Sequence, residues 1–234
     1  MRYLLVVVIM LVFAPKTNSQ TFEVGPYIGG ANYIGDVGRT NFVLPSGLIG
    51  GALLKWNRSP RHAFRFSLLY AEINADDANS NDPRRLNRGY SFNNTIAEAS
   101  LGLEYNFWSF DLHEGHPQST PYLYTGITYF RADHLLLDAD FPNGELENQG
   151  ANWDFAIPVV FGYKESITSH IVGALEVGVR YTFTDNLDGS WPEEIFGNRM
   201  PKREFGNRNT NDWYVFTGVN FTFSWGREPC YSRF

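Results

Sequence analysis

Cys230 has the most distinctive chemistry in this chain, because it is the only cysteine among 234 residues. A single cysteine excludes an intramolecular disulfide, so its thiol is either free or joined to another molecule. Pro229 precedes it and restricts the local backbone. In an oxidising compartment, such a thiol is a candidate for an intermolecular disulfide.

Two other groups of side chains contain parts of a reactive site. Ser169 and His170 are adjacent, but neighbours on a turn do not place a nucleophile against its base by themselves. His113 and His116, with Asp111 nearby, are of metal-ligand type but form an incomplete set. The sequence therefore predicts no catalytic residue, no metal and no cofactor.

In several segments, charged and other polar or small residues alternate with apolar ones. In residues 96–107, for example, alanine, leucine and aromatic side chains alternate with polar ones, so the two sets lie on opposite faces of a strand. The charges assigned in this way to the inner face are Glu23, Lys55, Arg65, Glu98, Glu104, Glu176 and Arg180. Because an unpaired buried charge costs several kcal/mol, we expect an ion-paired interior network rather than a conduction path.

Alternating segments occur at eight places and supply the strands that would hold these residues. They are residues 22–32, 48–57, 63–73, 96–107, 121–131, 153–164, 171–184 and 213–225. Each is close to the ~9–11 residues that a tilted transmembrane strand needs. Short and long connections alternate between them, as in outer-membrane barrels. Pro158 predicts a local irregularity within the sixth segment.

The predicted fold is therefore all-β: an eight-stranded antiparallel transmembrane β-barrel with short periplasmic turns and long extracellular loops. The last segment, residues 213–225, carries aromatic residues at both ends of its apolar face, as expected where a strand crosses two membrane interfaces. A soluble β-sandwich is the alternative, but it would not show the alternation of loop lengths.

The N-terminus and the charge balance indicate the compartment. Residues 1–19 combine an early arginine, a short apolar run and small polar residues, which is the pattern of a secretory signal peptide. We assign residues 20–226 to the barrel and 227–234 to a periplasmic tail, with both termini periplasmic. The net charge of −6 and the lack of a basic cluster argue against nucleic acid as a partner.

Four segments, followed by the trailing cysteine, occur in a characteristic order along the chain: residues 29–38, 92–107, 180–188 and 212–219. Together they resemble the PorG family of the type IX secretion system. One departure is Asn186, where the family pattern has an aromatic residue. The resemblance implies a non-enzymatic barrel in the outer membrane of a Gram-negative bacterium. It also implies a role in protein transport and gliding motility, through tethering of a periplasmic ring built from a lipoprotein and its soluble partner.

Three hypotheses follow. In the first, the barrel is anchored in outer-membrane lipid and Cys230 forms an intermolecular disulfide with the ring; a free thiol is the alternative for that residue. In the second, the barrel is a lipid-modifying enzyme that uses Ser169 or His170. In the third, it is a passive structural or adhesion barrel whose long outer loops are the working surface.

Overall fold

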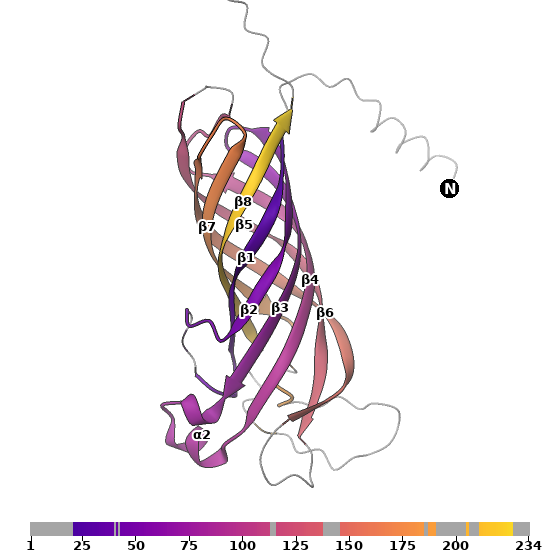
Figure 1. Ribbon diagram of the computed structural model, residues 1–234. Coiled ribbons are helices and arrows are strands. Elements are labelled where there is room, and N and C mark those ends of the chain that lie inside the picture. Colours follow the sequence, from indigo (N-terminus) through magenta and orange to yellow (C-terminus); the bar gives the residue numbers. More distant parts are fainter. Residues whose placement is uncertain are drawn as a thin grey trace, which may run out of the picture.

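The computed structural model describes residues 21–39, 41, 43–112, 116–137, 146–184, 187–190, 205 and 211–226. Within them the chain forms eight strands and two short helices (Figure 1). The strands are β1 (Thr21–Ile34), β2 (Gly47–Ser59), β3 (His62–Asp76), β4 (Ser91–Asn106), β5 (Ser119–Leu137), β6 (Leu146–Ser166), β7 (Ile171–Thr182) and β8 (Trp213–Gly226). The 3-10 helix η1 (Asp77–Asn79) and the α-helix α2 (Pro83–Arg88) lie between β3 and β4.

The strands pair with their sequence neighbours and close into one barrel, in the order β1 to β8. Every pairing is antiparallel, including the closing pair of β1 with β8. This confirms the predicted fold class and all eight predicted strands. β5 and β6 are longer than expected, with 19 and 21 residues, and extend beyond the wall at the end that carries the long loops.

Two prolines interrupt the pairing of strands without changing its register. The β5–β6 ladder lacks the pairs opposite Ile157 and Pro158, and the pairs on either side keep one register. Pro26 has the same effect on the β1–β8 ladder. A proline has no N–H to donate, so one side of its strand loses a ladder bond. The irregularity predicted at Pro158 is thus present, but as a gap in pairing.

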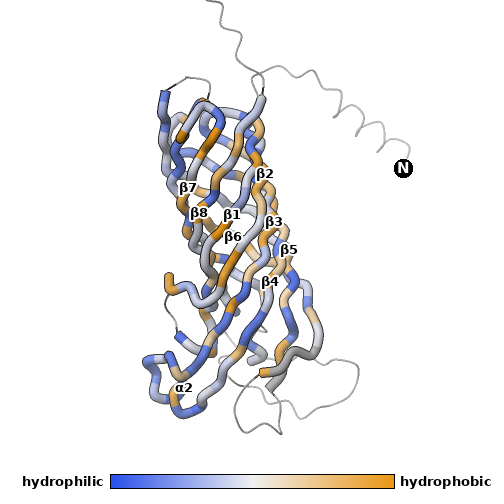
Figure 2. The backbone as a smooth tube through the Cα atoms, viewed as in Figure 1, coloured by the Kyte–Doolittle hydropathy of each residue, from blue (hydrophilic) through white to orange (hydrophobic). Residues whose placement is uncertain are grey.

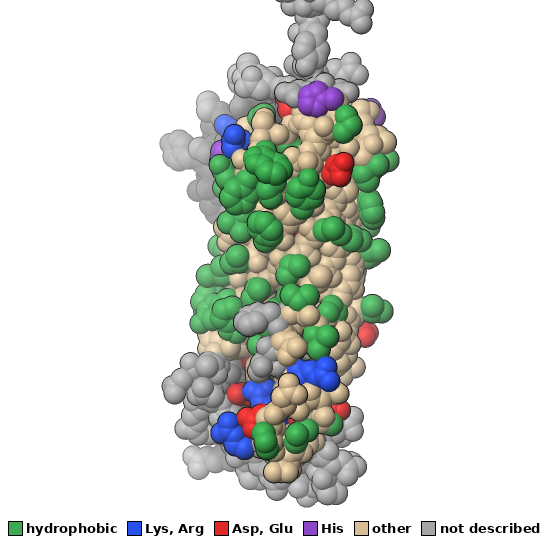
Figure 3. Space-filling model, turned by 90° about the vertical axis from the view of Figure 1, so that its left-hand side faces the viewer, with side chains coloured by type: hydrophobic (Ala, Val, Ile, Leu, Met, Phe, Trp, Pro, Cys, Tyr) green, Lys and Arg blue, Asp and Glu red, His purple; other side chains and the backbone are tan. Residues whose placement is uncertain are grey.

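The outside of the barrel is apolar. Hydrophobic side chains are spread over the face of the barrel that Figure 3 shows. Exposed hydrophobic residues occur on many of the strands and include Ile28, Leu48, Leu101, Ile127 and Leu175. They alternate along the strands with buried residues, as a wall between lipid and a filled interior requires. Among the described residues, no helix is long and apolar enough to cross a membrane.

Aromatic residues form a girdle at each end of this apolar wall. At the short-turn end, Trp225, Phe22, Trp56 and Phe64 lie in a row across β8, β1, β2 and β3, with neighbouring ring centroids 5.5 to 6.3 Å apart. At the long-loop end, the Tyr129 ring stacks on Trp153 and the Tyr181 ring meets Trp213 edge to face. Such girdles mark the two interfaces of a membrane.

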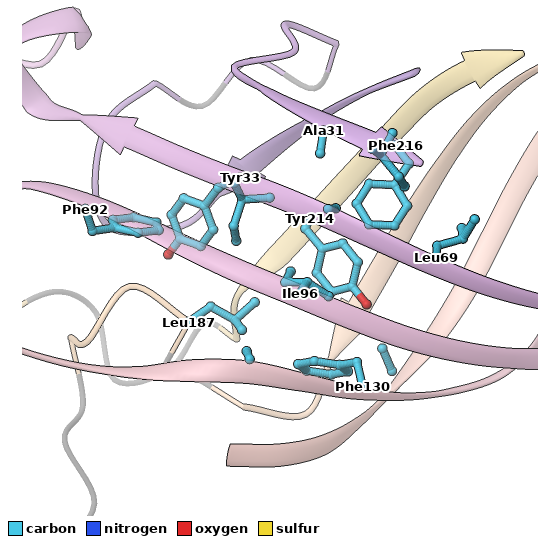
Figure 4. Close-up of a cluster of buried hydrophobic side chains, with 14 of the residues drawn as sticks. Ala31, Tyr33, Leu69, Phe92, Ile96, Phe130, Leu187, Tyr214 and Phe216 are labelled. Carbon is cyan, nitrogen blue, oxygen red and sulfur yellow. The ribbon is translucent and has the colours of Figure 1, made fainter. Parts of the chain in front are cut away.

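The inside of the barrel has two parts. Toward the long-loop end it is a hydrophobic core, which includes Tyr33, Phe92, Ile96, Phe130 and Leu187 (Figure 4). Leu187 belongs to the β7–β8 connection, so this loop folds back into the mouth of the barrel, where its carbonyl accepts a bond from Asn94 Nδ2 at 2.8 Å. Toward the short-turn end the interior is polar and charged. The runs of hydrophobic and hydrophilic residues along the chain are visible in Figure 2.

Asp77 organises the β1–β2 and β3–β4 connections at the long-loop end, which we call the outer cap. Its buried carboxylate accepts bonds from the Gly38 and Tyr90 N–H groups and pairs with Arg88 at 2.8 Å. Arg88 also donates to the Asp36 carbonyl, so the β1–β2 and β3–β4 connections are tied together.

A pair of opposed glycines in β4 and β5 allows the register of these two strands to be tested. Gly102 of β4 lies opposite Gly126 of β5, and a Cβ on Gly102 would overlap the Thr125 carbonyl oxygen. We expect Gly102→Ala to lower the free energy of urea unfolding in detergent by about 1–3 kcal/mol, because the backbone must shift. In Gly50→Ala, the new Cβ would have its nearest atom at 4.0 Å, so we expect a change within about 0.5 kcal/mol. Equal effects of the two variants would contradict the register.

Candidate functional site

The charged interior of the short-turn half is centred on Glu104 of β4. Lys55 Nζ of β2 lies 3.0 Å from Glu104 Oε2, and Lys164 Nζ of β6 lies 2.6 Å from Glu104 Oε1. All three side chains are fully buried. The strands that supply them are not neighbours, so these ion pairs cross the lumen and connect separate parts of the wall.

A second cluster joins Arg65 of β3 to Glu176 of β7. The guanidinium donates from both terminal nitrogens to the two carboxylate oxygens, at 2.7 and 2.9 Å. Glu176 also accepts bonds from the Tyr122 hydroxyl and from Asn220 Nδ2, and the Arg65 guanidinium lies 4.8 Å from the Tyr124 ring centroid. Bidentate pairs of this kind fix both partners in orientation as well as in charge.

A third cluster lies nearer the hydrophobic core. Arg180 Nη2 donates to Glu98 Oε1 at 3.0 Å, and the Tyr214 hydroxyl donates to Glu98 Oε2 at 2.8 Å. The Arg180 guanidinium packs 4.2 Å from the Phe216 ring centroid. Aromatic rings thus form the boundary between the charged and the apolar halves of the lumen.

Glu23 differs from the other predicted interior charges. It is buried as predicted, but its oxygens accept bonds from neutral groups, Asn57 Nδ2 and Thr222 Oγ1, both at 2.6 Å. Within the described residues it has no ion pair. The expectation of charge pairing therefore applies to Lys55, Arg65, Glu98, Glu104, Glu176 and Arg180, whereas Glu23 is satisfied by hydrogen bonds alone.

Lys164 and the interior tyrosines were missed by the sequence analysis. The alternation of β6 could have identified Lys164, because it follows the outward-facing Tyr163 directly. Alternation in residues 213–225 places Tyr214 on the inward face, but no sequence pattern marks Tyr122, Tyr124 or Tyr214 as a partner of an interior charge. With Lys164 included, the described strand interior holds four basic and four acidic side chains, Lys55, Arg65, Lys164 and Arg180 with Glu23, Glu98, Glu104 and Glu176.

A cap covers the charged interior at the short-turn end. The Phe110 N–H donates to the Pro60 carbonyl, and the Arg61 guanidinium donates to the Phe107 carbonyl, so the β4–β5 and β2–β3 connections hold each other. Phe110 is buried, with its ring centroid 4.7 Å from Lys164 Nζ. The polar network is thereby packed against an aromatic ring where the barrel ends.

The described residues among those considered for catalysis and metal binding are not assembled into a site. Ser169 and His170 are exposed in the β6–β7 turn, where the His170 N–H donates to Thr168 Oγ1 and its ring lies 5.8 Å from Phe223. In the described part of the chain, no group of three or more His, Cys, Asp or Glu side chains is placed to hold a metal ion. His113, Cys230 and the predicted signal peptide, residues 1–19, lie outside the described residues.

The Asp188 carboxyl group in the outer loops has a raised pKa. Asp188 follows Leu187 into the mouth of the barrel, is fully buried, and accepts the Ser190 N–H at 2.9 Å. Burial raises the pKa of its carboxyl, since the charged form is desolvated there.

Comparisons with known proteins identify a family. Residues 2–233 match a family model described as a domain of unknown function, DUF6089. No curated protein sequence matches.

Solved structures with a similar fold are the N-terminal β-barrel domain of Pseudomonas aeruginosa OprF and Neisserial surface protein A. The first has 13% identity and a TM-score of 0.44, covering 89% of this chain and 100% of that chain. The second has 10% identity and a TM-score of 0.44, covering 88% and 99%. A major outer membrane protein from Thermus thermophilus has 12% identity and a TM-score of 0.47, covering 89% and 100%. These likenesses concern the fold alone.

The ion pairs at Glu104 give a test of the interior. We expect Glu104→Gln to lower the free energy of unfolding by about 3–5 kcal/mol, because it leaves two buried lysines without their counter-charge. Glu165→Gln removes an exposed carboxylate next to Lys164 in sequence and should have an effect below about 0.5 kcal/mol. Adding Lys164→Met to Glu104→Gln should recover part of the loss. Urea titration in detergent measures all three, and a Glu104→Gln variant as stable as the wild type would contradict the network.

Proposed function

We propose a function for this chain, which belongs to the DUF6089 family of domains of unknown function: it is a non-enzymatic outer-membrane component of a type IX protein secretion system. In this role the barrel is fixed in outer-membrane lipid. It tethers the periplasmic ring, composed of a lipoprotein and its soluble partner, to that membrane.

The observation that carries the proposal is the position of the two barrel termini. β1 begins and β8 ends at the short-turn end, where Thr21 pairs with Gly226 and Phe22 with Trp225 (Figure 1). In outer-membrane barrels the short turns face the periplasm. This arrangement supports a periplasmic exit of the chain after Gly226, before the segment that contains Cys230, and the periplasm is a compartment where disulfides form.

The segments that resemble the PorG family contribute to the outer cap and to the charged interior of the barrel. Residues 29–38 run from β1 into the outer cap, and residues 92–107 and 180–188 supply Glu98, Glu104 and Arg180 of the interior network. The filled interior supports a role as an anchor, since its charged side chains form ion pairs and hydrogen bonds with one another rather than lining a binding site. The role of the ring as partner comes from the sequence resemblance.

The exposed turn around Ser169 gives no support to the lipid-modifying alternative. A hydrolytic serine needs a base within hydrogen-bond reach and a third group that orients that base. The His170 N–H donates to Thr168 Oγ1, its carbonyl accepts from the Ser224 N–H, and its ring lies against that of Phe223. The proposal accordingly assigns neither residue a catalytic role.

A thiol-relocation experiment tests the tether. On non-reducing gels of cell envelopes, the wild type should show a high-mass adduct that contains the ring lipoprotein and disappears on reduction. Cys230→Ser should remove the adduct, because the chain then has no thiol. Adding Leu86→Cys to Cys230→Ser places an exposed thiol on α2, at the opposite end, and should not restore it.

Affinity purification from detergent-solubilised envelopes separates the covalent link from the tether itself. If the ring lipoprotein co-purifies with both the wild type and Cys230→Ser, and no adduct exists, the disulfide is wrong and the tether stands. If the lipoprotein co-purifies with neither, the tether is wrong. Deleting residues 189–208 should leave ring assembly intact, whereas an adhesion barrel would lose its working surface.

A further inference from the structure

The β1–β2 connection does not simply close the mouth of the barrel but returns over the outside of the wall. Gly30 and Asn32 of β1 face outward, since their neighbours Ala31 and Tyr33 are buried inside. A Cβ on Gly30 would overlap the Pro45 ring, so Pro45 covers the outer face of this glycine. We call residues 43–46 the hook; Figure 2 shows a hydrophobic part of this connection beside β1 and β2.

Hydrogen bonds fix the hook to the wall on both sides. Before it, Asn32 Nδ2 donates to the Asn41 carbonyl at 3.1 Å. At its end, the Ser46 N–H donates to the Ala31 carbonyl at 2.9 Å, and Ser46 and Asn74 exchange two bonds of 2.7 and 2.8 Å. Pro45 has no N–H to satisfy. Both backbone polar groups of Ser46 are bonded, whereas those of Val43 and Leu44 and the Pro45 carbonyl have no partner among the described residues. They therefore need a surrounding in which lipid headgroups or water can bond them, at the edge of the apolar layer.

The pairing of β1 places the hook at the membrane boundary. Ile34 pairs with Trp213 of the long-loop girdle, whereas Gly30 pairs with Thr217, further toward the middle of the barrel. The four steps from Gly30 to Ile34 span roughly 13 Å along the strand, which corresponds to about 10 Å along the axis of the barrel because the strand is tilted. Pro45 thus lies on the membrane side of Trp213, within the depth of about 5–10 Å at which peripheral segments contact acyl chains.

The neighbours of the hook show which medium surrounds it. Leu48 of β2 is directly opposite Gly30, is 76% exposed, and belongs to the lipid-facing wall. Val43 and Leu44 of the hook are 54% and 41% exposed and carry no charge. The apolar surface of the hook is therefore continuous with the surface that meets lipid.

We propose that Val43 and Leu44 insert at the boundary between headgroups and acyl chains of the outward-facing leaflet, and that the hook is a lipid-binding element of the β1–β2 connection. The occupant of this surface is lipid, not a protein partner. The depth of the hook and its continuity with the apolar wall support this contact, which is independent of the secretion role.

Spin labelling of the whole protein tests this contact. A nitroxide is attached to Val43→Cys in a Cys230→Ser background, and the protein is folded into vesicles of phosphatidylcholine and phosphatidylglycerol. Collisions of the label with oxygen, which concentrates in lipid, are compared with collisions with a water-soluble nickel chelate. Leu48→Cys gives the lipid control, and Leu86→Cys on the exposed face of α2 gives the aqueous control.

The label at Val43 should show an oxygen-to-nickel ratio several-fold above that at Leu86 and close to that at Leu48. Leu44→Cys provides a second labelled position if Val43→Cys fails to fold. A ratio equal to that at Leu86 would place the hook in water and overturn the proposal. Low accessibility to both reagents would show the side chain packed against the barrel itself and would also overturn it.

Discussion

The constraint on which this structure depends is that charges inside a closed barrel must be paired. A barrel of about eight strands has room only for side chains in its interior. Each carboxylate oxygen of Glu104 forms an ion pair with a lysine, one from β2 and one from β6. The ion pair between Arg65 and Glu176 connects β3 to β7. Because these pairs join strands that do not neighbour each other, they stabilise one cross-section of the barrel and fill its lumen at the same time.

The outside of the barrel meets a different constraint, since lipid offers no hydrogen bonds to the backbone. Closure of β1 on β8 leaves no strand edge, and the apolar wall ends in an aromatic girdle at each side. The two constraints divide the residues of every strand between two faces. The girdles also explain the high aromatic content of the chain.

Much of this arrangement could be predicted from the sequence, because a period of two assigns each side chain to a face. This alternation placed Arg65 and Glu104 inside the barrel. It could not identify their ion-pair partners, since the partner of a lumen-facing charge depends on strand tilt and register. Glu23 shows the limit: its partners are Asn57 and Thr222, which alternation marks as inward but not as ligands of a carboxylate. The hook and the inward fold of Leu187 depend on contacts between loops and distant strands, which no local pattern records.

The central claim is that the barrel is a sealed anchor whose interior charges bind one another. Planar-bilayer recording of the purified protein tests this most directly. The wild type should give no defined current steps, because ion pairs and the hydrophobic core fill the lumen. Reproducible steps in the wild type whose size or ion selectivity changes in Glu104→Gln would show that ions pass this carboxylate, and would contradict the account.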